Sequence, residues 1–156
     1  AWLSAATLFK LFSGAFVSTT GGANTGCVVN GLYDSWPLCN GELLPSIDDW
    51  VLQSQVIHRW LVVAVGVALL VASYLIWKEG EGGQCGSTLC KWIWGATGLY
   101  LVNIVIGASY ILSWDMVDGY LEYLSLVHLV LASLAFLVLA TAWLGSTVVA
   151  LQERRL

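Results

Sequence analysis

Charged residues are scarce in this sequence: Asp, Glu, Lys and Arg make up 10% of its 156 residues. Soluble domains carry about 25% charged residues. The scarcity therefore excludes an ordinary water-soluble domain, and we expect no nucleic-acid partner. Hydrophobic residues instead account for 58% of the chain.

Long apolar runs take the place of the missing charges. Stretches of about 20 mainly apolar residues are typical of membrane-spanning helices. The first stretch lacks the basic start and the small-residue cleavage site of a signal peptide, so we expect it to be a transmembrane helix. We predict an all-α membrane protein, a bundle of four transmembrane helices in a single domain over residues 1–156. The expected helices cover about 2–19, 51–77, 92–114 and 120–151.

The distribution of the few charges predicts the orientation in the membrane. The long segment 20–50 contains no Lys or Arg, but it has acidic residues. Lys and Arg are enriched in cytoplasmic loops, and four of the six here are Lys78 and Lys91 of the short loop and Arg154 and Arg155 at the end of the sequence. We therefore predict a multi-pass protein of the plasma membrane with both termini inside and the long loop 20–50, between helices 1 and 2, outside.

Histidine is also rare: the chain has two, His58 and His128. Each follows an aromatic residue of the expected outer interface by eight positions, Trp50 and Tyr120 respectively. At about 1.5 Å per residue, both histidines lie on the order of 12 Å below that interface. Ionisable residues inside a membrane are costly and usually functional. Two imidazoles at one depth on parallel helices suit the two axial positions of a haem iron.

Other interpretations of the histidine pair are weaker or remain open. A zinc site needs three or four ligands, and the sequence has no third histidine. Arg59, next to His58, is placed to pair with a haem propionate. The alternative is that His58 and His128 form hydrogen bonds across the bundle and bind no ligand.

Two further features of the apolar stretches call for an interpretation. Lys10 lies inside the first stretch, so it snorkels to the interface, precedes the start of the helix, or has a direct role. Small residues recur at four-residue spacing in the second stretch, at Ala64, Ala68 and Ala72. Such spacing favours close contact between membrane helices. The glycines of the third stretch are interpreted in the same way: Gly95, Gly98 and Gly107.

The sequence has four cysteines but no Cys-x-x-Cys motif. This argues against a disulfide-generating quinone oxidoreductase, because those enzymes need that reactive spacing and two pairs that can exchange. Cys27 and Cys39 lie in the expected outer loop, where disulfides form, and we predict a bond between them. Cys85 and Cys90 lie in the expected inner loop, where thiols are normally reduced, so a second disulfide there stays open.

Five segments, spread in order over most of the chain, together resemble the haem A synthase family. The outer loop is similar to that family's Thr-Gly turn and first cysteine, followed by Asp-x-Trp-Pro-x-Cys. The second helix has a similar His-Arg signature, and the third and fourth helices contain similar stretches. The segments are STTGGANTGC (18–27), DSWPLCNG (34–41), IHRW (57–60), NIVIGASYIL (103–112) and VHLVLASLAFLVL (127–139).

The resemblance implies a reaction and a ligand set. Family members have eight helices in two similar halves, and this chain resembles one half in the compact archaeal form, which implies a homo-oligomer. The implied reaction oxidises the C8 methyl of haem O to a formyl group, giving haem A for terminal oxidases. His58 and His128 would be the axial ligands of a bound haem b, haem O or haem A. Contacts with a terminal oxidase or a haem O synthase are also expected.

Gln55 departs from the family pattern. The family has a glutamate three residues before the histidine of the second helix, and Gln55 and His58 share a helix face at that spacing. An amide can donate a hydrogen bond but cannot carry a proton as a carboxylate does. Two functions therefore follow: a haem A synthase in which Gln55 occupies the catalytic position, or a haem b-binding membrane subunit of a terminal oxidase complex, for assembly or electron transfer.

Overall fold

The computed structural model describes residues 1–23, 26–27, 32–45, 50–80, 87–117 and 121–153. Within these ranges the chain is helical, with one isolated bridge between Cys39 and Glu42. The predicted all-α class is therefore confirmed. The helices are α1 (Trp2–Thr19), the short α2 (Leu32–Ser35), α3 (Trp50–Glu79), α4 (Thr88–Val117) and α5 (Glu122–Glu153).

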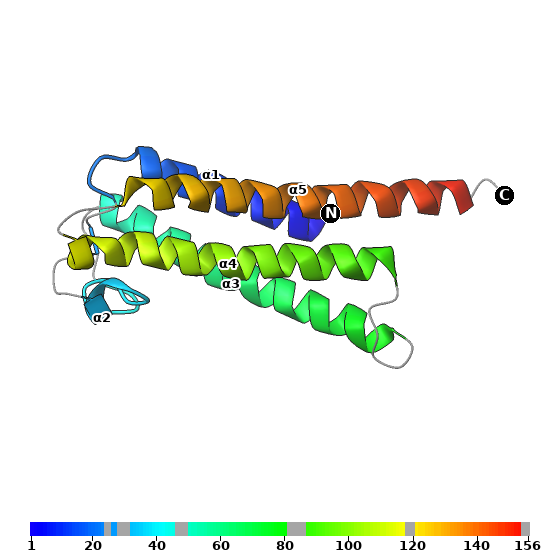
Figure 1. Ribbon diagram of the computed structural model, residues 1–156, viewed down its shortest axis with the longest axis horizontal. Helices are drawn as coiled ribbons and strands as arrows, with labels where there is room; N and C mark the ends of the chain where they lie inside the picture. Colours follow the sequence, from blue (N-terminus) through cyan, green and yellow to red (C-terminus); the bar gives the residue numbers. More distant parts are fainter. Residues whose placement is uncertain (24–25, 28–31, 46–49, 81–86, 118–120, 154–156) are drawn as a thin grey trace.

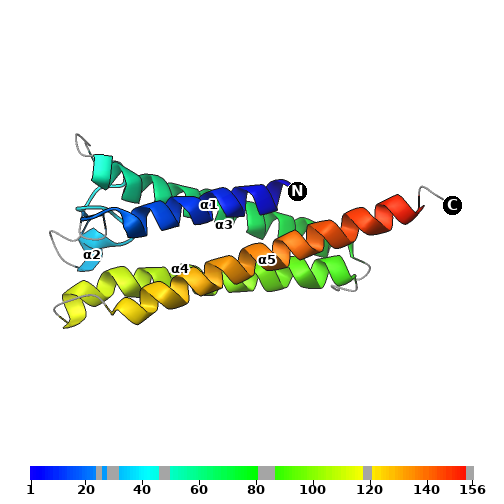
Figure 2. The same cartoon turned by 90° about the horizontal axis from the view of Figure 1, so that it is seen from above.

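The four long helices form an antiparallel bundle (Figures 1 and 2). α1 packs on α3 and α4 packs on α5, and these two hairpins meet through α3 with α4 and α1 with α5. α3 and α5 therefore occupy opposite corners of the bundle and run in the same direction. We call the end that holds α2 and the first residues of α3 and α5 the loop end (Figure 1).

Three of the long helices, α3, α4 and α5, are long and apolar enough to cross a membrane. The chain is thus a multi-pass membrane protein. α1 has the predicted bounds, but it is 18 residues long and has Lys10 at its middle. Its crossing of the membrane stays a prediction, as does the orientation with both termini inside.

The inner loop is shorter than predicted. α3 continues to Glu79, and α4 begins at Thr88 instead of residue 92, so Cys90 and Lys91 lie in the first turn of α4. The Cys90 backbone N–H donates to the Ser87 hydroxyl oxygen at 3.1 Å, which is the bond of an N-cap serine. A run of apolar residues predicts only the part of a helix that crosses the membrane. The N-cap of α4 precedes that run, so the helix begins earlier than predicted.

The largest buried hydrophobic cluster of the described residues lies away from the loop end. A buried cluster there joins α3, α4 and α5, and Leu3 and Ala6 of α1 pack against it. Ser73 and Thr97 share a hydrogen bond of 2.8 Å between α3 and α4. The cluster consists of Val65, Leu69, Ile93, Ala96, Tyr100 and Leu139.

Within this single chain, the small-residue stripe of α3 does not make the predicted contact at Ala64 and Ala68, while Ala72 is partly buried. Ala64 and Ala68 are exposed, and α3 meets its neighbours through Val65, Gly66 and Leu69 instead. Gly95 and Gly98 of α4 likewise have nothing within 4 Å of an added Cβ. The four-residue spacing gives a helix face but does not say which face the bundle buries.

Candidate haem-binding site

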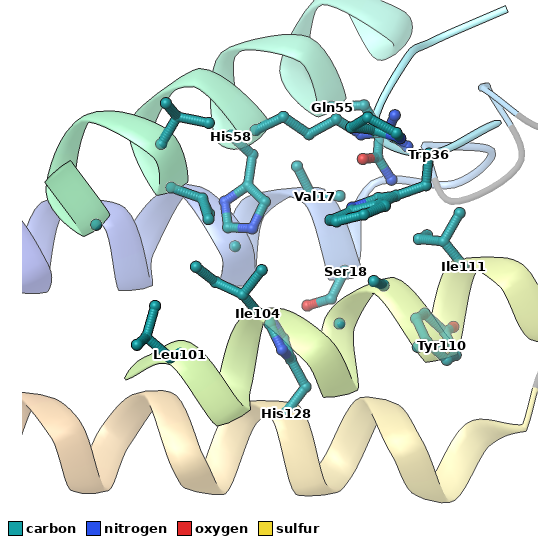
Figure 3. Close-up of a pocket in the computed structure, with 18 of the residues that line it drawn as sticks. Val17, Ser18, Trp36, Gln55, His58, Leu101, Ile104, Tyr110, Ile111 and His128 are labelled. Carbon is teal, nitrogen blue, oxygen red and sulfur yellow. The ribbon is translucent and has the colours of Figure 1, made fainter. Parts of the chain in front are cut away.

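Residues of the hairpins α1–α3 and α4–α5, together with Trp36 and Pro37, line a cavity of about 400 Å³. Ligand pockets in proteins commonly measure about 300–1,000 Å³. Both histidines line it, His58 from α3 and His128 from α5, and Figure 3 shows their rings projecting into it from opposite sides. The sequence predicted this pairing from depth alone.

The imidazole of His58 is held by α1. Its Nδ1 lies 2.9 Å from the Ser13 hydroxyl oxygen. That hydroxyl also lies 2.7 Å from the Lys10 carbonyl oxygen, so it can donate to this oxygen and accept from Nδ1–H of His58. Gly14 leaves room for the ring, because a Cβ at Gly14 would lie 2.9 Å from His58 Cε1.

The imidazole of His128 is held by α4 in a similar way. Its Nδ1 lies 2.9 Å from the Asn103 backbone oxygen. A carbonyl oxygen only accepts hydrogen bonds, so Nδ1 carries the hydrogen here. A Cβ at Gly107 would lie 2.6 Å from His128 Cε1, and glycine is therefore needed for this close approach.

The bond to the Asn103 backbone sets the tautomer of His128, and the bond to Ser13 is compatible with the same tautomer in His58. With Nδ1 protonated and bonded, the Nε2 of each neutral ring has a free lone pair, which is the arrangement of a metal-binding histidine with its supporting acceptor. The alternative interpretation was that His58 and His128 only form hydrogen bonds across the bundle. Both histidines do form a hydrogen bond, but each bonds through Nδ1 to the other helix of its own hairpin. No three His, Cys, Asp or Glu side chains of the described residues cluster for a bare metal ion. The site fits a haem with two axial histidines.

Gln55 and Arg59 also line the cavity on α3. Gln55 is 4% exposed, and its side chain forms no hydrogen bond with a described residue. No Asp or Glu is present among the described residues that line the cavity, so no carboxylate replaces the family glutamate there. Arg59 Nη1 donates to the Leu38 carbonyl oxygen and so ties the loop between α1 and α3 to α3.

Described residues of the loop between α1 and α3 cover part of the cavity. The sulfurs of Cys27 and Cys39 lie 2.11 Å apart, at bonding distance as predicted, and both residues are buried. Trp36 and Pro37 of the same loop line the cavity (Figure 3). Sequence reasoning missed Trp36 as a cavity residue, although it lies inside the DSWPLCNG segment. Of the second cysteine pair, Cys90 has no free thiol, and Cys85 lies outside the described residues.

Lys10 neither snorkels nor precedes its helix. α1 begins at Trp2, and Lys10 is 3% exposed with its ammonium 5.3 Å from the centre of the Tyr100 ring. No acidic side chain of the described residues pairs with it. The Tyr100 hydroxyl donates to the Val62 backbone oxygen at 2.9 Å. Lys10 thus lies in the packed interior and contributes a cation–π contact.

The lining of the cavity changes in polarity along the bundle. Toward the loop end it includes Gln55, Arg59 and the polar side chains of Ser18, Tyr110 and Ser125. Away from the loop end it is wholly apolar. We call this second part the apolar groove, formed by Val63, Gly66, Val67, Leu70, Leu101 and Ile104.

Comparison with known proteins points to one family. Over 81 residues the chain is 35% identical to the haem A synthase of Geobacillus kaustophilus, covering 49% of this chain and 24% of that protein. Over 79 residues it is 37% identical to the haem A synthase of Bacillus licheniformis, covering 47% of this chain and 22% of that protein. The chain thus spans about a quarter of the length of these curated relatives. No family profile and no solved structure matches. About half of the chain is therefore similar in sequence to haem A synthases.

Proposed function

We propose that the protein is an oxidoreductase of the haem A synthase type, which binds haem O between His58 and His128 and oxidises its C8 methyl to a formyl group. The observation that carries this proposal is the pair of imidazoles in one cavity, each with Nδ1 bonded and Nε2 free. Arg59 would pair with a propionate at the polar end. The similarity of half of the chain to haem A synthases supports the same function.

The residues of this chain would bind and orient the substrate. Turning a methyl into a formyl group with water as the oxygen source releases four electrons and four protons, so an electron acceptor of the membrane must take part. Gln55 can position water by hydrogen bonding but cannot take up a proton. Proton removal would therefore need water or a group outside the cavity lining described above.

The proposal includes a setting in the cell. We place the protein in the plasma membrane with loop 20–50 on the outer side, as a homo-oligomer in which a second copy supplies the other half of the family architecture. Contact with a haem O synthase or a terminal oxidase would pass substrate in and product out. Crosslinking of the protein in intact membranes tests the homo-oligomer.

A second candidate is a haem b-binding subunit of a terminal oxidase complex, used for assembly or electron transfer. The observation that favours it is Gln55, an amide at the position where the family has a carboxylate, in a cavity whose described lining has no acid. Such a subunit would use the same two histidines without oxidising its ligand.

Expression with a source of haem O, followed by extraction and chromatography of the pigments, separates the two candidates. We expect haem A from the native protein and none from His58→Ala or His128→Ala. Bound haem O that is never converted would rule out the synthase and favour the subunit, and a protein that binds no haem would contradict both. Gln55→Glu should increase conversion, whereas Gln53→Glu, at an exposed position of the same helix, should not.

A further inference from the structure

The cavity continues well past the two histidines. On α3 its lining extends from Gln55 through His58 to Leu70. Because a helix rises about 1.5 Å per residue, the stretch from His58 to Leu70 is on the order of 18 Å long. A flat ring held between two imidazoles at one depth does not need so long a cavity along the helix axis. Binding of the iron by the two histidines therefore does not account for the apolar groove.

The polarity of the cavity gives a direction to its ligand. Arg59 lies at the polar end, and the groove beyond the histidines offers no polar side chain. A ligand that matches this lining has anionic groups toward Arg59 and a hydrocarbon chain toward Leu70. A polar ligand would leave its own hydrogen-bonding groups unpaired in the groove, which is costly.

The groove is open to the side of the bundle. Val67 and Leu70 on α3 and Leu101 on α4 are each about half exposed, and they lie in helices that are apolar enough to span the membrane. The groove therefore faces lipid. Gly66 forms part of its floor, where an added Cβ would touch Tyr100 Cε1 at 3.4 Å. A hydrocarbon chain can enter such a groove from the bilayer without passing through water.

We propose that the apolar groove binds the long isoprenoid chain of haem O and thereby distinguishes haem O from haem b, which has a vinyl group at that ring position. The proposal rests on the proposed function, since it takes a haem held by His58 and His128 as the ligand. Its basis is the continuity of the groove with the histidine cavity, its wholly apolar lining and its lateral opening. Because the chain of free haem O already lies in lipid or detergent, the selectivity comes from packing in the groove.

The test is a titration of the purified full-length protein in detergent with haem O and with haem b, followed by absorbance. Val67→Trp and Leu70→Trp place a large ring in the groove, while the matched controls Val71→Trp and Val102→Trp change equally exposed positions outside it. We expect each groove variant to weaken haem O binding at least about tenfold relative to haem b, since overpacking displaces the chain. The controls should keep the native ratio.

Three outcomes would overturn the groove assignment. They are equal binding of both haems by the native protein, groove variants that weaken both haems alike, and groove variants that change only the oligomeric state or the copurified lipid. The last would mean that a second copy or an acyl chain fills the groove. Haem O bound selectively but never converted would contradict the synthase and leave the groove assignment intact. Absence of haem binding would overturn both.

Discussion

The hairpins α1–α3 and α4–α5 present their histidines in the same way with different chemical groups. In each hairpin the second helix carries the imidazole, and the first supplies an acceptor for Nδ1 and a glycine beside the ring. The acceptor is the Ser13 side chain in one hairpin and the Asn103 backbone in the other. The shared arrangement is therefore set by the close approach of two antiparallel helices, and the supporting residues differ.

The two hairpins differ more at the loop end. Gln55 and Arg59 both belong to α3, and the loop closed by Cys27 and Cys39 connects α1 to α3. The α4–α5 hairpin has only a short connection there. The first hairpin thus brings Gln55 and Arg59 to the cavity, and the second brings an imidazole that is held by a backbone oxygen. Substitutions in matched positions can test how far this asymmetry extends.

The largest effect is expected from Gly107→Ala. The new Cβ would lie 2.6 Å from His128 Cε1, so the ring must move out of line with its partner. Gly14→Ala brings a Cβ to 2.9 Å from His58 Cε1 and needs a smaller shift. We expect haem affinity to fall roughly 100-fold for Gly107→Ala and roughly tenfold for Gly14→Ala. The measurement is a haem titration followed by the low-spin absorbance spectrum.

Gly98→Ala is the control for both glycine variants, because nothing lies within 4 Å of its added Cβ. Alanine is favoured over glycine in helices by about 1 kcal/mol, so the haem-free control should be as stable as the native protein or more so. Unchanged haem binding in Gly107→Ala would show that His128 does not need its observed position. The difference in haem affinity between the Gly107 and Gly14 variants would then say nothing about how the two histidines bind iron.

A smaller effect is expected from Ser13→Ala. The change removes the acceptor of His58 Nδ1–H and leaves the matching bond of His128 to the Asn103 backbone in place. Loss of such a supporting acceptor costs about 10–100-fold in metal affinity, and we expect the lower value here because water can enter the cavity. Haem titration measures it, with Ser109→Ala, a partly exposed serine bonded within α4, as the control. Equal affinity for both variants would contradict the role of Ser13.

Sequence patterns predicted the helices well because membrane crossing has a simple physical requirement. The bounds of α1 match the prediction, and α3 and α5 differ by one or two residues at each end. The start of α4 was predicted four residues too late, since the capping bond from Cys90 to Ser87 lies outside the apolar span. The stripe with Ala64 and Ala68 was predicted to be packed but is exposed, because residue size alone does not identify a neighbour.

The candidate site could be predicted only in part. His58 and His128 were found because they are the rare ionisable groups of the apolar stretches. Arg59 followed from its position next to His58, and Gln55 from the resemblance to the haem A synthase family. Gly14 and Ser13 could not be found in this way, because their role depends on which helix packs against α3. The apolar groove left no signal, since its valines and leucines look like any lipid-facing helix surface.

The smallest effect is expected from Asn103→Leu, which tests whether the α4–α5 hairpin depends on the Asn103 backbone alone. Asn103 is buried, and neither polar atom of its side chain has a hydrogen-bond partner in the described part of the chain. Replacing an unsatisfied buried amide with an apolar side chain of similar size should stabilise the protein by about 1–2 kcal/mol. The bond from His128 uses the backbone oxygen, so haem affinity should stay unchanged.

Denaturant unfolding in detergent gives the stability, and Asn103→Ala, which leaves a cavity, should be less stable than Asn103→Leu. A leucine variant that loses haem affinity would mean that the amide itself contacts the ligand, and the second hairpin would then hold its haem through a side chain as the first does.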